Sequence, residues 1–392
     1  MIDSAALKEL FLIKKDITYL NFGAYGSCPK PIFEAYQQFQ LELETEPTVF
    51  VNETGPAYLK TAREALATYL HCQADELVYI TNPSYAVNII AKSLQIGPGD
   101  EILTTNLEYG PCDKTLNFYC EQTGATYIRQ KIRFPLESKE DFIAQFCAGI
   151  SAKTKLIFIS HLTSSTALRL PVEEICAIAN ERGIMVFVDG AHAPGQLPID
   201  LEKLGADIYT GACHKWMMTP KGSSFLYVKK SLHHLFEPLV ISWGYKTANP
   251  SGSLLIDNHQ LQGTRDYAAF LTIPKAIEFM QTHQWNQVNA YCRQLCQDNA
   301  LRFCDLMGTK PKSPINDHFI GQLFSIPIEI SHPEKLHDHL YATYKIQVPV
   351  PSHEGQFYLR YSLQGFNSQS DLDQLFDAMK TVILKQSLAV KS

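Results

Sequence analysis

Short apolar runs rich in β-branched residues alternate with helical patterns between about residues 57 and 228. The runs ELVYI, EILTTN, TKLIFISHL, IMVFVDG, ADIYTGA and FLYV are separated by segments with apolar residues at helical spacing. This alternation predicts a parallel sheet with crossover helices. Runs as apolar as LIFIS and MVFVD are typical of strands buried on both faces, so we expect helices to cover both sides of the sheet.

The pattern changes after about residue 264. The long helical segments AAFLTIPKAIEFMQTHQ and QVNAYCRQLCQDNALRFCDLM are followed by the short strands GQLFSIPI, YKIQVPV and QFYLRYS and by a last helix. We expect a large domain over 19–283, a smaller α+β domain over 284–392, and an N-terminal segment, 1–18, that packs with the smaller domain. No flexible linker marks the boundary near 284, so a continuous helix is expected to join the domains.

Composition narrows the class of function. The 392 residues carry 34 basic and 40 acidic side chains, a net charge of −6, without a basic cluster, which argues against nucleic acid and favours a small-molecule substrate. We expect neither a signal peptide nor a membrane-spanning segment. Ten cysteines without a CxxC pair or a Cys/His ligand set indicate reduced thiols in a cytoplasmic protein, with neither disulfides nor a metal site.

Two of the expected strands end in residues that can act on one ligand. Asp189 closes the run IMVFVDG, and ADIYTGA leads into Lys215. Because ligands of open α/β sheets bind at the carboxyl ends of the strands, both side chains should face the same ligand. Pyridoxal 5′-phosphate (PLP) needs such a pair: a lysine that forms an imine and an acid that keeps the pyridine nitrogen protonated. Taken singly, such an Asp is more often a cap, and such a Lys a solvated surface charge.

The stretch VDGAHAPGQLPIDL…DIYTGACHKWMMTPKGSSFLYV resembles the signature of class V aminotransferases, and nearly the whole chain is similar to isopenicillin N epimerase-like members of that family. The resemblance implies an α/β fold of the fold-type I PLP-dependent transferases, with a mostly parallel seven-stranded sheet and a smaller α+β domain. It implies that Lys215, after His214 in the HK motif, holds PLP as a Schiff base. Asp189 would pair with the pyridine nitrogen, and His192 would reach the phenolic oxygen.

The resemblance also places the phosphate of the cofactor. In YITNPSYAVNIIAKSL, Ser84 and Tyr85 stand where a helix starts and offer backbone N–H groups and a hydroxyl. The alternative is a plain Ser N-cap after a turn at Asn82 and Pro83. Thr264, in LQGTRDYAAF, matches the element whose Thr reaches the phosphate in the neighbouring subunit, which implies a homodimer; its alternative is also a helix N-cap.

Two more segments match positions around the cofactor ring. Tyr109, in TTNLEYGPCDKT, stands where related enzymes stack an aromatic or histidine ring, with an ordinary buried aromatic as the alternative. HLTSST corresponds to the loop below the ring and offers Thr163 and Ser164 as donors to the phenolic oxygen. Related cysteine desulfurases usually have Asn where this chain has Ser164.

On the substrate side, FYLRYSLQGFN resembles the RxS…YN motif, whose arginine, here Arg360, forks onto the substrate α-carboxylate. The alternative is a structural ion-pair residue. The turn NFGAYGSCP, which starts at Asn21, resembles the substrate-side N-terminal loop of the family.

The family resemblance implies removal of the α-proton of an amino acid, with Lys215 as the base. Epimerisation, transamination and elimination differ in the fate of the resulting carbanion. The VPV stretch before Arg360 and the NPSYAVN, EYGP and CHKW variants resemble epimerase-like members, so an epimerase or aminotransferase is preferred and a cysteine/cystine C–S lyase is the alternative. A desulfurase is disfavoured because no cysteine follows Cys304 to accept sulfur. A dehydrogenase lacks its GxGxxG, and a PLP-binding protein without turnover would not need Lys215 together with Arg360.

Overall fold

The computed structural model describes residues 2–389, and its centre is a seven-stranded sheet with the order β2-β8-β7-β6-β5-β3-β4. Strands β3 to β7 pair in parallel, and β8 is antiparallel to both of its neighbours. The predicted mostly parallel sheet is confirmed. The strands are β2 (Leu77–Ile80), β3 (Glu101–Thr105), β4 (Thr126–Gln130), β5 (Thr154–Ser160), β6 (Met185–Gly190), β7 (Ile208–Ala212) and β8 (Ser224–Val228).

Alternate residues of these strands enter two separate apolar clusters, one on each face of the sheet. In β5, Ile157 and Ile159 belong to one cluster, and Leu156 and Phe158 to the other. Helices cover both faces, as the apolar strands predict. α5 (Gly55–Leu70), α8 (Lys139–Cys147) and α9 (Val172–Glu181) pack on the first cluster, and α6 (Pro83–Ser93), α7 (Gly110–Thr123) and α11 (Leu254–Gln260) on the second.

The expected continuous helix near residue 284 is wrong. α12 (Ala268–Leu271) and α13 (Ile273–Thr282) are followed by a break, and α14 (Trp285–Met307) starts anew. Gln284 has a left-handed backbone, φ 49°, which ends the helical path. The turn lets Trp285, which is buried, pack against Phe279 with ring centroids 5.5 Å apart.

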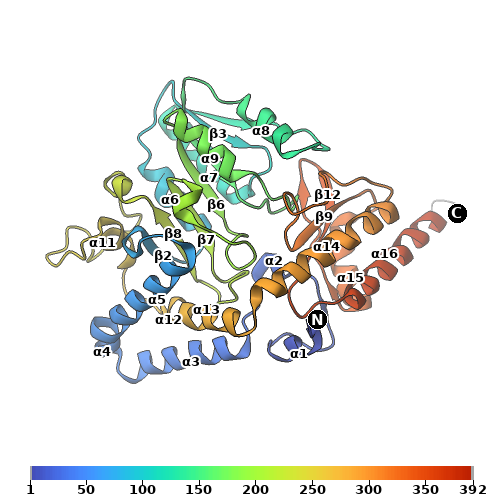
Figure 1. The fold of residues 1–392 in the computed structure, drawn as a ribbon, viewed down its shortest axis with the longest axis horizontal. Coiled ribbons are helices and arrows are strands. Elements are labelled where there is room, and N and C mark those ends of the chain that lie inside the picture. The colour runs from blue at the N-terminus through green and yellow to red at the C-terminus, as the bar shows by residue number, and fades with distance from the viewer. Residues whose placement is uncertain (1, 390–392) are drawn as a thin grey trace.

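The C-terminal part of the chain is a three-stranded antiparallel sheet with long helices, on the right of Figure 1. Its order is β11-β12-β9. The elements are β9 (Leu323–Ile328), β10 (Ile346–Gln347), β11 (Ser352–His353), β12 (Gln356–Ser362), α15 (Leu336–Tyr344) and α16 (Gln369–Ala389).

The N-terminal residues lie against this C-terminal part. β1 (Thr18–Tyr19) pairs in parallel with β10, the Ser4 hydroxyl donates to the Asn367 carbonyl at 3.0 Å, and the rings of Phe11 and Phe366 are 4.9 Å apart. The division into domains at 18/19 and 283/284 stays a prediction. The remaining helices are α1 (Ser4–Glu9), α2 (Phe22–Tyr25), α3 (Lys30–Thr45), α4 (Pro47–Val49) and α10 (Leu201–Leu204).

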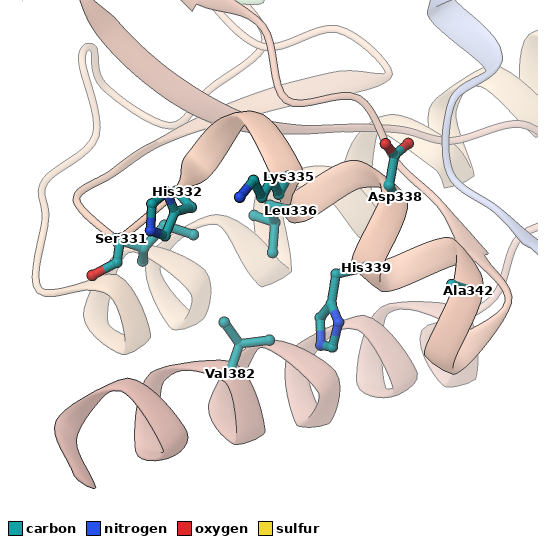
Figure 2. A pocket seen from close by; sticks show the side chains of 9 residues that line it. Ser331, His332, Lys335, Leu336, Asp338, His339, Ala342 and Val382 are labelled. Carbon is teal, nitrogen blue, oxygen red and sulfur yellow. The ribbon is translucent and has the colours of Figure 1, made fainter. Parts of the chain in front are cut away.

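A cavity of about 560 Å³ lies between α15 and α16 (Figure 2). Lys335, Asp338, His339 and Val382 are among its lining residues, and it contains none of the predicted site residues. Within residues 2–389 no three His, Cys, Asp or Glu side chains are grouped as a metal site requires. No helix of this part of the chain has the length and apolar character to cross a membrane.

Candidate active site

A cavity of about 370 Å³ opens at the carboxyl edge of the central sheet. Ser160 ends β5, Asp189 lies near the end of β6, and Lys215 follows β7, so three adjacent strands deliver side chains to one space. The strand polarity therefore brings together residues that are distant in sequence. The lining residues are Ala24, Tyr25, Asn82, Pro83, Ser84, Tyr109, Ser160, Leu162, Ser164, Asp189, Ala191, His192, His214 and Lys215.

Asp189 presents a buried carboxylate without a basic partner in the described part of the chain. Its Oδ1 accepts from the backbone N–H of Ala191 at 2.9 Å, and its Oδ2 faces the Sγ of Cys112 at 3.6 Å. Burial raises the pKa of Asp189, while the Ala191 hydrogen bond and the charge of Lys215 oppose the rise. Because a buried charge needs compensation, a cationic group of a ligand would be stabilised here.

The Lys215 amine is held by a buried histidine. His192 Nε2 lies 3.2 Å from Lys215 Nζ, and Trp216 Nε1 donates to His192 Nδ1 at 3.5 Å. Since an indole N–H can only donate, the proton of the neutral imidazole belongs on Nε2. Nε2–H then faces Nζ, and the contact is a hydrogen bond only when the amine is unprotonated.

The electrostatic surroundings of Lys215 favour this neutral amine. Burial lowers the pKa of Lys215 to about 8; Asp189 opposes the shift, and the charge of Arg360 adds to it. Burial also holds the pKa of His192 well below its usual range. A fraction of Lys215 is therefore a nucleophile near neutral pH, as covalent attachment to an aldehyde requires.

Arg360, on β12, is a buried guanidinium behind the cavity wall, only 4% exposed. Its Nη1 donates to the carbonyl and hydroxyl of Ser164 at 2.7 and 3.2 Å, and its Nε is buried without a partner. Burial lowers the pKa of Arg360 to about 10, and the ionisable neighbours that act on it are Tyr25 and Tyr109, not an acid. The alternative of a structural ion pair therefore has no support within residues 2–389.

The start of α6 differs in detail from the predicted phosphate loop. Asn82 is the N-cap, and its side chain accepts from the backbone N–H of Tyr85 at 3.0 Å, so the alternative of a Ser84 N-cap is wrong. Tyr85 does not line the cavity and its amide is engaged, so of the two predicted residues only Ser84 faces the space, together with Asn82 and Pro83. His214, which also lines it, donates from Nδ1 to the Ser223 carbonyl, 2.9 Å away, and burial lowers its pKa to about 4.

The other predicted residues lie at different depths. Tyr109 lines the cavity and is 46% exposed, so the alternative of a buried aromatic is wrong. Thr163 is buried outside the lining, with its hydroxyl engaged by Thr166 at 2.7 Å and by Leu168. Asn21 is the N-cap of α2, outside the lining, with a buried Oδ1 that lacks a partner. Thr264 is exposed and four residues before α12, so its N-cap alternative is also wrong.

Comparison with known proteins shows the family of the chain. The family model described as aminotransferase class-V matches residues 18–375. The chain belongs to the aminotransferase class-V family. It is 31% identical, over 96% of its length and 98% of the other chain, to the isopenicillin N epimerase of Amycolatopsis lactamdurans. It is 26% identical to the L-cysteine desulfhydrase of Arabidopsis thaliana, over 94% of its length and 88% of that protein.

A solved structure confirms the fold. The apo cysteine desulfurase of Thermococcus onnurineus NA1 superposes with a TM-score of 0.84 at 18% identity, covering 98% of this chain and 99% of that one. The predicted family and fold are thus confirmed. As a class V aminotransferase family member, the protein is a PLP-dependent enzyme.

The charges of the cavity fit this cofactor. PLP carries a ring nitrogen that can be protonated, an aldehyde that reacts with an amine, and a phosphate. The unpaired carboxylate of Asp189 suits the first and the amine of Lys215 suits the second. Ser84, in the first turn of α6, suits the third, because helix N-termini favour anions.

Sequence reasoning missed several residues at the site, among them Ser160, Glu108 and Cys112. Ser160 lines the cavity, and its hydroxyl donates at 2.5 Å to the buried carboxyl of Glu108, which Thr105 also contacts at 2.6 Å. Burial raises the pKa of Glu108 to about 7. Cys112 contacts Asp189 from α7. Ser160 could have been predicted, because it is the last residue of β5, the strand beside β6. Glu108 and Cys112 have no sequence signal except that they lie close to Tyr109 along the chain.

Proposed function

We propose that the protein acts on the α-carbon of an amino acid, with PLP bound in the 370 Å³ cavity and covalently attached to Lys215. The observation that carries this proposal is a cavity that holds both the carboxylate of Asp189, which has no basic partner, and the amine of Lys215. Behind its wall lies the guanidinium of Arg360, which has no acidic partner. These groups match the needs of one cofactor and one amino acid.

When bound, PLP supplies an electron-withdrawing ring that stabilises negative charge at the α-carbon. Asp189, as a carboxylate, keeps the ring nitrogen protonated. Arg360 binds the substrate carboxylate through the edge that Ser164 leaves free. Lys215 would hold the cofactor, and its Nζ, oriented by His192, would serve as the base for the α-proton.

The remaining predicted residues surround the cofactor in this proposal. Ser84, with Tyr85 behind it in α6, would serve the phosphate, and Tyr109 would stack on the ring. Ser164 and His192 would serve the phenolic oxygen. The hydroxyl of Thr163 stabilises the loop instead, because it forms hydrogen bonds with Thr166 and Leu168. Asn21, whose buried Oδ1 has no partner, would serve the substrate side at the start of α2.

The proposed reaction is of the isopenicillin N epimerase type, supported by the 31% identical relative over nearly the full length. Lyase activity on cysteine or cystine is the second candidate, supported by the L-cysteine desulfhydrase relative. A persulfide-forming desulfurase is disfavoured, because the segment between β10 and β12 has no cysteine.

An absorption spectrum of the purified holoenzyme before and after borohydride reduction tests the proposal. A visible band that reduction removes, with the cofactor mapped to the Lys215 peptide, supports it. A panel of L- and D-amino acids, cysteine and cystine included, is then followed by chiral chromatography and by a sulfide assay. Inversion at Cα supports the epimerase, and sulfide release supports the lyase. A protein that binds no PLP overturns both.

Replacing Arg360 with alanine should weaken amino-acid binding about 10²- to 10³-fold, because a buried charge pair is truncated. The cofactor band should persist, since Lys215 and Asp189 keep their contacts. Dissociation constants from spectral titration measure the effect. Arg302→Ala is the control, because Arg302 pairs with Asp373 away from the cavity. Equal affinity in Arg360→Ala and wild type would contradict the role of Arg360.

We also propose a homodimer in which Thr264 serves the neighbouring cavity. Thr264 is exposed and does not line the cavity of its own chain. Large apolar side chains of the preceding segment are exposed, among them Ile241 at 71% and Trp243 at 88%. A second subunit would remove this apolar surface from water.

Thr264→Ala should weaken PLP binding about tenfold without changing the dimer mass, because one hydrogen bond to an anion is lost. Sedimentation measures the mass, and fluorescence titration measures PLP affinity. Mixed dimers of Lys215→Ala and Thr264→Ala decide the geometry. If Thr264 acts across the interface, one site of each mixed dimer has both residues and regains wild-type affinity. A monomer, or no recovery in mixed dimers, would contradict the proposal.

A further inference from the structure

The short helix α2 (Phe22–Tyr25) places a tyrosine at the mouth of the cavity. We propose that the hydroxyl of Tyr25 is a second donor to the substrate α-carboxylate, beside Arg360, and that it selects free amino acids against their amides. This inference rests on the proposed function. It adds a substrate-binding residue from the N-terminal turn, of which Tyr25 and Ala24 line the cavity.

One side of the α2 turn is fixed to the strand that carries Arg360. The backbone N–H of Gly23 donates to the Ser362 hydroxyl at 2.8 Å, and the backbone N–H of Ser362 donates to the Leu20 carbonyl at 2.9 Å. Ser362 is two residues after Arg360 on β12, so both side chains point to the same face of the sheet. The position of Tyr25 is thereby coupled to that of Arg360.

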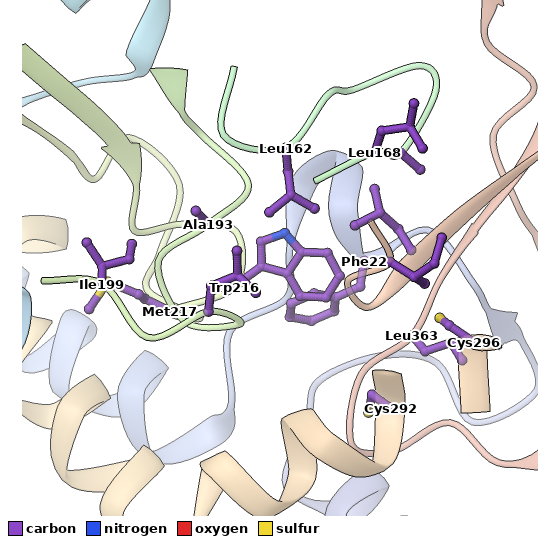
Figure 3. Packing of buried hydrophobic residues seen from close by; sticks show 14 of the residues in the cluster. Phe22, Leu162, Leu168, Ala193, Ile199, Trp216, Met217, Cys292, Cys296 and Leu363 are labelled. Carbon is purple, nitrogen blue, oxygen red and sulfur yellow. The ribbon is translucent and has the colours of Figure 1, made fainter. Parts of the chain in front are cut away.

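The other side of the turn is fixed to the segment that carries Lys215. The ring of Phe22 lies 5.4 Å from that of Trp216, and Figure 3 shows the indole packed beside Phe22 and Leu162. Gly26 has φ 62°, and a Cβ there would lie 2.2 Å from the His214 carbonyl oxygen. The chain therefore passes directly over the backbone of the lysine turn, where only glycine fits.

Tyr25 is held by this turn but its hydroxyl is free. The side chain is 69% exposed, and no group within residues 2–389 forms a hydrogen bond with the hydroxyl. Tyr25 and Tyr109 are the two phenols close enough to Arg360 to influence its pKa. A donor without a partner, on a turn that is fixed on both sides and near a guanidinium without an acid, is an arrangement that a carboxylate would complete.

A phenol is a suitable second donor at this position. One carboxylate oxygen can bind the guanidinium edge left free by Ser164, and the other can accept from Tyr25. A second cation in place of the phenol would lower the pKa of Lys215 further, since the charge of Arg360 already acts in that direction. A neutral O–H adds a hydrogen bond to the anion without this effect. An amide substrate offers one oxygen and no charge, so it would gain little from the pair.

The test compares Tyr25→Phe with wild type as holoenzymes. L-Alanine and L-alaninamide are the probes, and their dissociation constants are measured by spectral titration. We expect Tyr25→Phe to weaken L-alanine binding about ten- to a hundredfold, as for a hydrogen bond to a charged group, and to leave L-alaninamide unchanged. In the Arg360→Ala background the same substitution should have a smaller effect, because both residues act on one carboxylate.

The control is Tyr36→Phe, whose hydroxyl accepts from Gln40 on α3, outside the cavity. Equal weakening of both probes, unchanged L-alanine binding, or a wild-type enzyme that does not distinguish the probes would overturn the assignment of Tyr25. Absence of a cofactor band attached to Lys215 would instead overturn the proposed function. The two failures are therefore distinguishable.

Discussion

Replacing Lys215 with alanine should remove the borohydride-sensitive absorption band and lower kcat about 10⁴-fold or more. Two functions are lost together: the covalent bond to the cofactor and the base that takes the α-proton. No other amine lines the cavity within the described residues, so no side chain there can replace Nζ. Absorption spectroscopy and single-turnover kinetics measure the two losses separately.

Lys215→Ala should still bind PLP, although more weakly and without a covalent bond. Asp189 keeps its hydrogen bond from Ala191, and Ser84 keeps its place on α6. Lys203→Ala is the matched control, because Lys203 is an exposed residue paired with Asp200. A Lys215→Ala enzyme with wild-type activity would refute the central assignment, whereas full loss in Lys203→Ala would indicate a general loss of structure.

The residues at the strand ends were predictable for a topological reason. Asp189 follows a fully apolar run and Lys215 follows the next strand along the chain, so parallel pairing alone brings them to one edge. His192 follows from its place three residues after Asp189 in the family motif. The placement of Asp189 and Lys215 needs only parallel pairing, which the alternation of apolar runs and helical segments predicts.

Residues that reach the cavity through side-chain packing were not predictable in this way. Tyr25 owes its position to Phe22 against Trp216 and to Ser362, contacts that span nearly the whole sequence. Cys112 meets Asp189 because α7 covers the face of the sheet to which β6 contributes Phe187, and cysteine usually signals only a small apolar side chain. The break at Gln284 was not predicted for a similar reason. The helical pattern of the sequence continues through this position, whereas the turn follows from the packing of the buried Trp285.

Asp189→Asn is expected to have the second-largest effect, a fall in kcat/KM of about 10²- to 10³-fold. The substitution is nearly isosteric, and Asn can still accept from the Ala191 N–H. The charge that would keep the ring nitrogen protonated is lost, with the cost typical of a truncated buried charge pair. Steady-state kinetics and PLP titration measure it. Asp113→Asn is the control, because Asp113 pairs with Arg129 on the surface.

The same substitution should have opposite effects on stability without and with the cofactor. Burial raises the pKa of Asp189 in the folded protein, so folding favours its protonated form. The wild-type apoenzyme therefore loses stability as pH rises from the unfolded pKa through the folded one, and Asn, which does not titrate, escapes this loss. Apo Asp189→Asn should consequently have a higher melting temperature than wild type at pH 8, with a smaller difference at pH 4.

With PLP bound, wild type should have the higher melting temperature, because only the carboxylate pairs with a protonated ring nitrogen. An apo variant less stable than wild type at pH 8 would mean that Asp189 holds the fold, not the cofactor.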